Sequence, residues 1–270
     1  MCVPPKSTPK SLAICRLAIR SQVDAYLAAL TGPVDDFWER HVLRADTYAI
    51  RYGAETVGFF CCLMEDAPRM TAFWVNDTVS TADSERIFEK ALADLHIAHA
   101  FVATCDEHFL SLCLTYQTKV EIQAYFFDVD RTQDTRPAEF GADCMRRVTV
   151  HELPEVFALT GDFFVSDLTA ADIESGRIEL YRVVENGETL GFGVMIPDRL
   201  QTNLLPCGEI VLEPHRRRGV ARSLQLFMHA RCAALGKRHI GGCWFHNKPS
   251  RNTFDSIGLY SRTRLLNITF

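Results

Sequence analysis

The chain has 270 residues, of which 47% are hydrophobic and 23% are charged, and its formal net charge is −5. This composition is typical of folded globular proteins, and the length suits two domains of roughly 100–150 residues each. The acidic balance argues against bulk attraction to nucleic acid or to an anionic membrane surface.

The start of the chain and its cysteines predict the compartment. The first residues, MCVPPKSTPK, lack the apolar core of a signal peptide. The sequence also lacks an apolar run of ~18 residues, the length needed to cross a membrane. The ten cysteines are scattered, form no CxxC pair and lie mostly within apolar runs, as buried thiols do. We therefore expect a reduced, cytoplasmic protein with no membrane partner.

The first half reads as an alternation of helices and strands. Residues 21–30 predict a helix with Ser21 as N-cap, and the runs TYAIRYG and TVGFFCCL around a glycine predict a hairpin. A strand (MTAFWVND), a helix over residues 84–95 and a second strand (AHAFVAT) follow. A short helix and the closing strand VEIQAYFFDV complete the half. The next stretch, DRTQDTRPAEFGAD (residues 130–143), is polar and predicts a domain seam.

The second half repeats this order. ALTG recurs at residues 29–32 and 158–161, and GAETVGFF (residues 53–60) returns as GETLGFG (residues 187–193). LTAADIESG, with Thr169 as cap, predicts a helix that corresponds to the one over residues 21–30. The hairpin IELYRVVENG–TLGFGVMI, the strand CGEIVLE, a helix over residues 219–235, the strand HIGGCWF, a short helix and the closing strand RLLNITF follow. The order predicts a mixed α/β (α+β) fold built from two copies of one domain, over residues 1–135 and 143–270.

The turn HRRRG, at residues 215–219, joins a predicted strand to a predicted helix. Val220, Leu224, Phe227 and Met228 follow it at helical spacing, and Gly236 ends the helix. Backbone N–H groups at such a helix N-terminus bind anions, and Gly219 allows an anion to approach the backbone closely. The sequence has neither a GxxxxGK[ST] phosphate loop nor a GxGxxG dinucleotide motif.

This loop resembles the coenzyme A loop of the GCN5-related N-acetyltransferases (GNAT), which carry Q/R-x-x-G-x-G/A between their fourth strand and third helix. Arg216, Gly219 and Ala221 fill that pattern, and Val211 stands where the family usually has a strand valine. The block NKPSRNTFDSIGL resembles the family's next motif. CWFHNKPSRNTFDSIGL looks most like acetyltransferases related to zwittermicin A resistance proteins. The resemblance implies two tandem GNAT-like domains, each with a mixed, mostly antiparallel sheet flanked by helices.

The resemblance spans residues 148–270, and the first half does not share the loop. At the corresponding place it reads NDTVSTADSERIF (residues 76–88), without glycine and with three acidic residues. Because acidic side chains repel a pyrophosphate, we interpret the first half as a degenerate copy that has lost coenzyme binding.

The resemblance also implies a reaction and a set of site residues. An amine of a small molecule or peptide attacks the thioester of acetyl-coenzyme A directly, and strand N–H groups polarise its carbonyl. Glu209 is the candidate base. Phe254 stands where the family usually has a proton-donating tyrosine, so Tyr260, Ser250 or water is left as the donor. The expected coenzyme-binding residues are Ile210, Val211, Leu212, Arg216, Arg217, Arg218, Gly219, Val220, Ala221, Arg222, Asn247, Ser250 and Phe254.

Alternatives remain open at this point. Asn247 could cap the helix that follows it instead of contacting the coenzyme. The chain could bind acyl-coenzyme A without catalysis, as a sensor or interaction module. Strand parity argues against a metal site formed by His239, Cys243 and His246, and no nucleic acid partner is expected. We expect a monomer or homodimer, and the sequence does not identify the acceptor amine.

Overall fold

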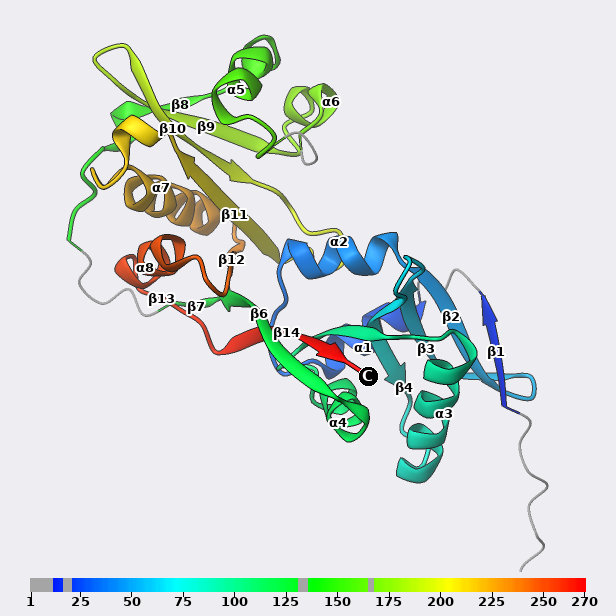
Figure 1. The fold of residues 1–270 in the computed structure, drawn as a ribbon. Helices are drawn as coiled ribbons and strands as arrows, with labels where there is room; N and C mark the ends of the chain where they lie inside the picture. The colour runs from blue at the N-terminus through cyan, green and yellow to red at the C-terminus, as the bar shows by residue number, and fades with distance from the viewer. Residues whose placement is uncertain (1–11, 17–20, 131–135, 165–167) are drawn as a thin grey trace, which may run out of the picture. The chain divides into compact units, whose positions relative to one another are not determined.

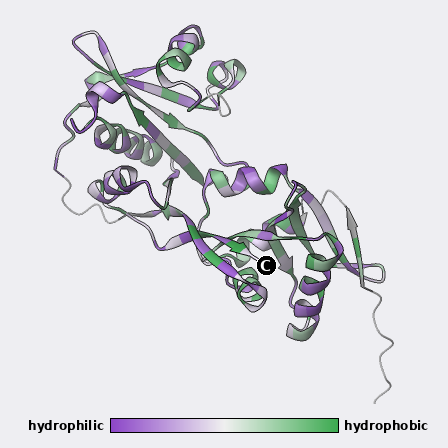
Figure 2. Cartoon of the chain, in the orientation of Figure 1, coloured by the Kyte–Doolittle hydropathy of each residue, from purple (hydrophilic) through white to green (hydrophobic). Residues whose placement is uncertain are grey.

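The computed structural model describes residues 12–16, 21–130, 136–164 and 168–270, which form two compact units (Figure 1). The first unit consists of Met1–Gln123 and Arg264–Phe270, and the second consists of Ala124–Thr263. Within each unit the strands pair with one another side by side. Figure 2 shows hydrophobic residues concentrated along central strands such as β4 and β11, while the helices carry both hydrophobic and hydrophilic residues.

The sheet of the first unit is antiparallel except where β4 and β5 run parallel. Its strands are, in spatial order, β1 (Leu12–Arg16), β2 (Asp46–Tyr52), β3 (Glu55–Leu63), β4 (Arg69–Val75), β5 (His99–Ala103) and β14 (Thr263–Thr269). Its helices are α1 (Ser21–Ala29), α2 (Asp36–Arg44), α3 (Thr81–Asp94) and α4 (Glu107–Tyr116).

Two helices lie on each face of this sheet. Phe88 of α3 and Phe109 of α4 pack with Phe60 in the main core. On the opposite face, Tyr26 of α1 packs against Phe59, the neighbouring residue in β3, with ring centroids 5.8 Å apart. Helix α3 begins at Thr81, three residues before the predicted start, because Ser80 caps it by accepting a hydrogen bond from the N–H of Asp83.

The second unit repeats this arrangement. Its strands are, in spatial order, β6 (Lys119–Phe127, joined through residues 124–127), β12 (Arg238–Trp244), β11 (Leu204–Val211), β10 (Glu188–Met195), β9 (Glu179–Glu185) and β8 (Met145–Arg147). Only β11 and β12 run parallel among these pairs. The helices are α5 (Leu153–Thr160), α6 (Ala170–Glu174), α7 (Val220–Ala234) and α8 (Lys248–Ser256), with the 3-10 turns η1 (Ala142–Cys144), η2 (Val150–Glu152) and η3 (Glu213–His215). A separate short ladder joins β7 (Val129–Asp130) to β13 (Leu259–Tyr260).

The closing strands are exchanged between the two halves of the sequence. Strand β14, from the end of the chain, pairs with β5, and its Ile268 is buried in the core of the first unit. Strand β6 pairs with β12, and its Tyr125 and Phe127 pack beneath α8. The units therefore differ from the predicted boundaries of 1–135 and 143–270. Both closing runs are apolar strands that can fill the same edge, so sequence order does not show which sheet each one joins.

The repeated phrases hold equivalent places in the two units. Both predicted hairpins form, as β2–β3 and β9–β10. Thr169 caps α6, as predicted, by accepting from the N–H of Asp172 at 3.2 Å. The proposed correspondence of α6 with α1 is wrong, because ALTG ends α1 in the first unit and α5 in the second. Helix α5 is therefore the counterpart of α1.

Candidate functional site

Strands β11 and β12 separate in the middle of the second sheet. Their pairing covers residues 204–206 and 238–240. Beyond it, β11 continues along β10, and β12 continues along β6. The carbonyl of Pro206 accepts from the N–H of Ile196, just after β10, and the N–H of Leu212 donates to the carbonyl of Leu190 in β10, both at 3.0 Å. Because backbone groups alternate along a strand, Glu209 and Val211 direct their N–H groups toward the opened side, where they can hydrogen-bond a ligand.

The turn between β11 and α7 lies at the end of this opening. Gly219 has φ +83° and precedes the first residue of α7, so it adopts a left-handed conformation that favours glycine. Arg217 also has a positive φ, +64°. HRRRG is therefore a strand-to-helix turn, as predicted, and Val220, Ala221 and Arg222 form the first turn of α7. Free N–H groups at such an end favour an anion.

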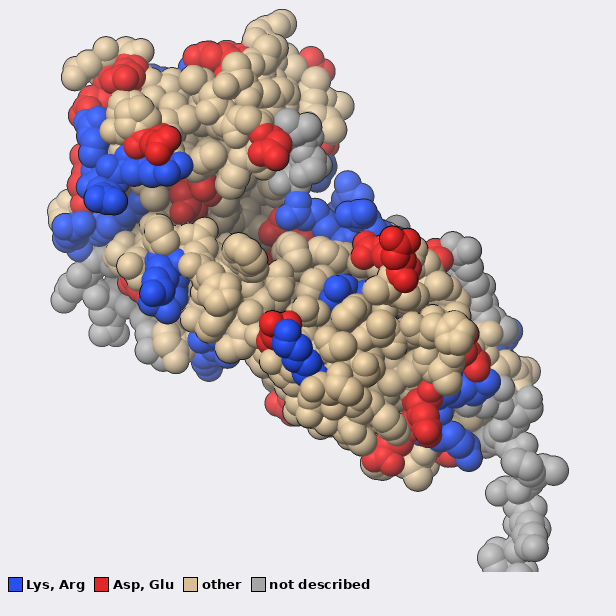
Figure 3. Space-filling view, in the orientation of Figure 1, with Lys and Arg blue, Asp and Glu red and all other residues tan. Residues whose placement is uncertain are grey.

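The three arginines of the turn and Arg222 of α7 have different environments. Arg216 and Arg217 are exposed. Arg218 pairs with Glu185 of β9 and lies 3.2 Å from His215 Nδ1. Arg222 has a side chain that is only 5% exposed, and it contacts residues 136–139. In Figure 3, acidic side chains lie among the basic ones on this part of the second unit, so the turn is a mixed charged surface with one glycine at its centre.

Glu209 projects from β11 toward α7, where Gln225 donates a hydrogen bond to its Oε2. Gln225 is fully buried, and burial raises the pKa of Glu209 to about 7. A carboxylate with a pKa near neutrality is suited to accept a proton. Sequence reasoning missed Gln225. The sequence did contain a signal for it, because Gln225 is a polar residue at helical spacing with Ala221, Met228 and Cys232 on one face of α7.

Cys243 lies on the strand next to Glu209, and Tyr125 lies on the strand beyond it. Cys243 of β12 interacts electrostatically with Glu209, and burial raises the pKa of its thiol to about 11. Tyr125 of β6 stands directly across from Cys243, and its hydroxyl lies 3.5 Å from Arg251 Nη1 of α8. Tyr125 was missed because it belongs to the first half of the sequence. No local pattern places that strand in the second sheet.

The residues of the second predicted block lie on α8 or next to it. Asn247 caps α8 by accepting from the N–H of Ser250 at 3.2 Å, which is the capping alternative left open above. Phe254 is 1% exposed and stacks on Phe127 at 4.6 Å between ring centroids. Tyr260 lies on β13 and is 40% exposed. No described contact joins Tyr260 to Glu209, so their proximity stays a prediction.

The equivalent place in the first unit is an open pocket. A cavity of about 380 Å³ lies where β4 ends and α3 begins, with α4 on its other side. Asp77 and Glu85 belong to its lining, and His108 contacts Ser84 at 3.0 Å. Residues 76–80 join β4 to α3 without a glycine. This pocket therefore differs in charge from the turn at Gly219.

The described parts of the chain hold no candidate for two other kinds of site, a metal centre and a membrane-spanning helix. Over the described ranges, no cluster of three or more His, Cys, Asp or Glu side chains could hold a metal ion. Among the helices that the structure describes, none has the length and apolar character to cross a membrane.

Comparisons with known proteins identify the fold. A family model described as "Acetyltransferase (GNAT) domain" matches residues 17–130, which is the half without the glycine-containing turn. No curated protein matches the chain. A GNAT-family acetyltransferase from Colwellia psychrerythraea superimposes with a TM-score of 0.83 at 18% identity, over 96% of this chain and 99% of that one.

Two further solved structures agree. A tandem GNAT protein from the clavulanic acid biosynthesis pathway gives a TM-score of 0.64 at 15% identity, over 96% of this chain and 98% of that one. A GCN5-related N-acetyltransferase from Sphaerobacter thermophilus gives 0.60 at 11% identity, over 96% and 95%. At these identities the likeness concerns the fold. Residues 17–130 therefore match the GNAT acetyltransferase domain, and the chain as a whole has the fold of two tandem GNAT units.

Proposed function

We propose that this protein is an acyl-coenzyme A-dependent N-acyltransferase that transfers acetyl to an amine of a small molecule or peptide. The observation that carries the proposal is the position of Glu209. Glu209 lies on β11 beyond the end of its pairing with β12, on the strand that leads into the turn at Gly219, and its carboxyl group accepts a hydrogen bond from Gln225. A proton acceptor and an anion-binding turn therefore share one strand.

The residues of the second unit fit such a coenzyme. The N–H groups at the start of α7 and the bare α-carbon of Gly219 suit a phosphate group. The N–H of Val211 points to the opened side of β11, where it can donate to a carbonyl oxygen. When bound, the coenzyme supplies the acyl group as a thioester. The side-chain oxygen of Asn247 accepts the hydrogen bond that caps α8, so its amide N–H₂ group can still donate to a ligand.

Glu209 acts in this proposal as the general base. Its pKa of about 7 means that it is largely ionised above neutral pH and can accept the proton of the attacking amine, directly or through water. Gln225 holds the carboxylate in place. The side chain of Phe254 cannot supply a proton to the leaving thiolate.

Tyr125 is the better placed proton donor of the two tyrosines. It stands directly across from Cys243, which interacts electrostatically with Glu209, and it lies beneath α8. Tyr260, the donor expected from the sequence, lies on the separate β7–β13 ladder. We therefore assign the donor role to Tyr125 and retain Tyr260 as the competing assignment.

A thiol-release assay with acetyl-coenzyme A and a panel of amines tests the activity. We expect turnover by the parent protein, and a loss of about 100-fold in kcat for Glu209→Gln with little change in coenzyme affinity. Glu174→Gln, an exposed change on α6, is the matched control. If the parent protein binds the coenzyme but acetylates no amine of the panel, the alternative of a non-catalytic sensor is favoured instead.

The pH profile tests the base and the donor separately. The parent rate should rise with pH up to about 7 as Glu209 ionises, and this rise should be absent in Glu209→Gln. Tyr125→Phe should lower kcat by about tenfold, whereas Tyr260→Phe should leave it unchanged. The reverse result would return the donor role to Tyr260.

A further inference from the structure

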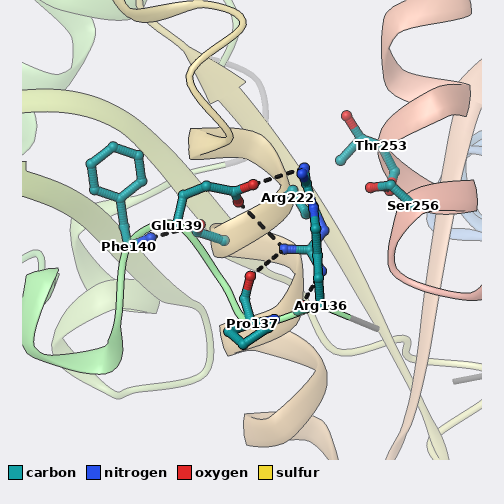
Figure 4. Close-up of polar contacts among 8 residues, drawn as sticks. Arg136, Pro137, Glu139, Phe140, Arg222, Thr253 and Ser256 are labelled. Carbon is teal, nitrogen blue, oxygen red and sulfur yellow. Dashed lines mark hydrogen bonds and ion pairs between the residues drawn. The ribbon is translucent and has the colours of Figure 1, made fainter. Parts of the chain in front are cut away.

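Residues 136–140, which follow β7, cover the turn at Gly219. Figure 4 shows this segment against the start of α7, with its polar groups directed at Arg222. Arg222 Nη1 donates to the carbonyl of Pro137 at 2.9 Å, and Nη2 donates to the carbonyl of Arg136. All of these residues belong to the second unit. An arginine expected to bind the coenzyme is therefore almost fully buried and is engaged by the chain itself.

Glu139 takes the position closest to the glycine. A Cβ atom built on Gly219 would lie 2.5 Å from Glu139 Oε2 and 2.6 Å from its Cγ. The carboxylate also pairs with Arg136 at 2.8 Å and with Arg222 at 3.4 Å. An anionic group thus lies on the bare face of the glycine, at the positive end of α7 and between two guanidinium groups. These are the features expected of a phosphate site.

Two further contacts, both made by Phe140, hold the segment against α7. The N–H of Phe140 donates to Ser223 Oγ at 3.0 Å, and both residues are buried. The Phe140 ring packs into the core that includes Val220 and Leu224. By contrast, the side chain of Glu139 is 29% exposed and that of Arg136 is 73% exposed. The anchor at Phe140 is therefore firm, while the ion pairs of Glu139 are of the weak, partly solvated kind.

We propose that residues 136–140 block the turn at Gly219 when no coenzyme is bound. We call this segment the lock. Glu139 occupies the place of a coenzyme phosphate, and the coenzyme binds by displacing it. A carboxylate and a phosphate cannot both lie on Gly219, and their like charges repel each other. The bound phosphate carries more charge and more acceptor oxygens than Glu139, so it competes effectively for Arg222 and the helix N-terminus. This inference rests on the proposed function, because it requires the coenzyme to bind in the second unit.

Acetyl-coenzyme A titrations by calorimetry test the lock with three variants. Glu139→Gln removes the charge from the turn, and Ser223→Ala removes the anchor of Phe140 without a change in charge. Glu213→Gln is the control, because Glu213 lies just before the turn, is 86% exposed and pairs only at 4.0 Å with Arg216. We expect the first two variants to bind about fivefold more tightly than the parent and the control to change less than twofold.

Other outcomes would overturn the lock. Unchanged or weaker binding by both Glu139→Gln and Ser223→Ala, with a parent that binds, would reject it and leave the proposed function intact. Equal tightening by Glu213→Gln would show a general charge effect instead. Absence of binding in the parent and in all three folded variants would reject both the lock and the coenzyme site.

Hydrogen exchange gives a readout that does not depend on affinity. In the parent protein, acetyl-coenzyme A should speed exchange at the amide of Phe140 and its neighbours while slowing it at the start of α7. Slower exchange in both places would mean that the segment closes over the coenzyme, and the lock would be wrong.

Discussion

Gly58 of β3 and Gly191 of β10 occupy the same position in the two units, each pressed against the end of the next strand. A Cβ on Gly58 would lie 2.9 Å from the α-carbon of Val75, and one on Gly191 would lie 3.1 Å from that of Val211. Each glycine also stands at a register shift of its hairpin. The repeated phrase therefore fixes how closely β4 and β11 approach the preceding strand.

Gly191→Ala should push the end of β11 outward and lower coenzyme affinity. The added methyl meets the carbonyl of Ile210 at 2.7 Å, which is backbone and cannot move aside cheaply. We expect a loss of about 1–3 kcal/mol in the free energy of unfolding and a coenzyme Kd weakened by about tenfold. Gly58→Ala in the first unit is the comparison, with a similar stability loss and an unchanged Kd. Equal effects of both variants on Kd would contradict the assignment of the coenzyme to the second unit.

Gly219→Ala should cost more stability than its backbone conformation alone explains. Gly187→Ala is the control, because Gly187 has φ +81° and an added Cβ there would have no atom within 4 Å. We expect the control to lose about 1 kcal/mol from the left-handed conformation. Gly219→Ala should lose about 1 kcal/mol more, because the methyl displaces Glu139. In a Glu139→Ala background this excess should disappear in urea unfolding, and its persistence would show that Glu139 does not lie on the glycine.

Glu209→Gln should stabilise the protein at alkaline pH. The pKa of Glu209 rises from 4.5 to about 7 on folding, because burial disfavours the carboxylate. The folded state therefore holds its proton more tightly, and stability is lost as pH rises from about 4.5 to about 7. Glutamine is neutral throughout, so the variant should exceed the parent by about 3 kcal/mol at pH 8 and match it at pH 4. A constant difference across this range in thermal melts would contradict burial of the carboxyl group.

Tyr26→Phe should destabilise the first unit through Asp106. The Tyr26 hydroxyl donates to Asp106 Oδ2 at 2.6 Å, and burial raises the pKa of Asp106 to about 6. Without the hydroxyl, the carboxylate keeps its helix-capping bond to the N–H of Phe109 but loses one donor. We expect a loss of about 1–2 kcal/mol at pH 8 and a smaller loss at pH 5, where Asp106 is protonated in the folded state. Tyr116→Phe in α4 serves as the control.

The sequence predicted the local structure of both units well, because the signals involved are short in range. The glycine between β9 and β10, the cap at Thr169 and the apolar spacing of α7 each depend on a few neighbouring residues. The turn at Gly219 could be located for the same reason. A strand must end and a helix must begin there, and glycine tolerates the left-handed conformation that the change of direction requires.

The tertiary structure decided which distant segments meet. Tyr125 enters the second unit because β6, from the first half of the sequence, completes its sheet. Gln225 reaches Glu209 only when α7 packs on β11, and the seam residue Glu139 reaches Gly219 only when the segment folds back onto α7. Strand pairing and ion pairing depend on proximity in space and leave no periodic trace in the sequence. The amino-acid order therefore determined the turn and its capacity for an anion, while the packed fold determined which groups of the chain reach that turn.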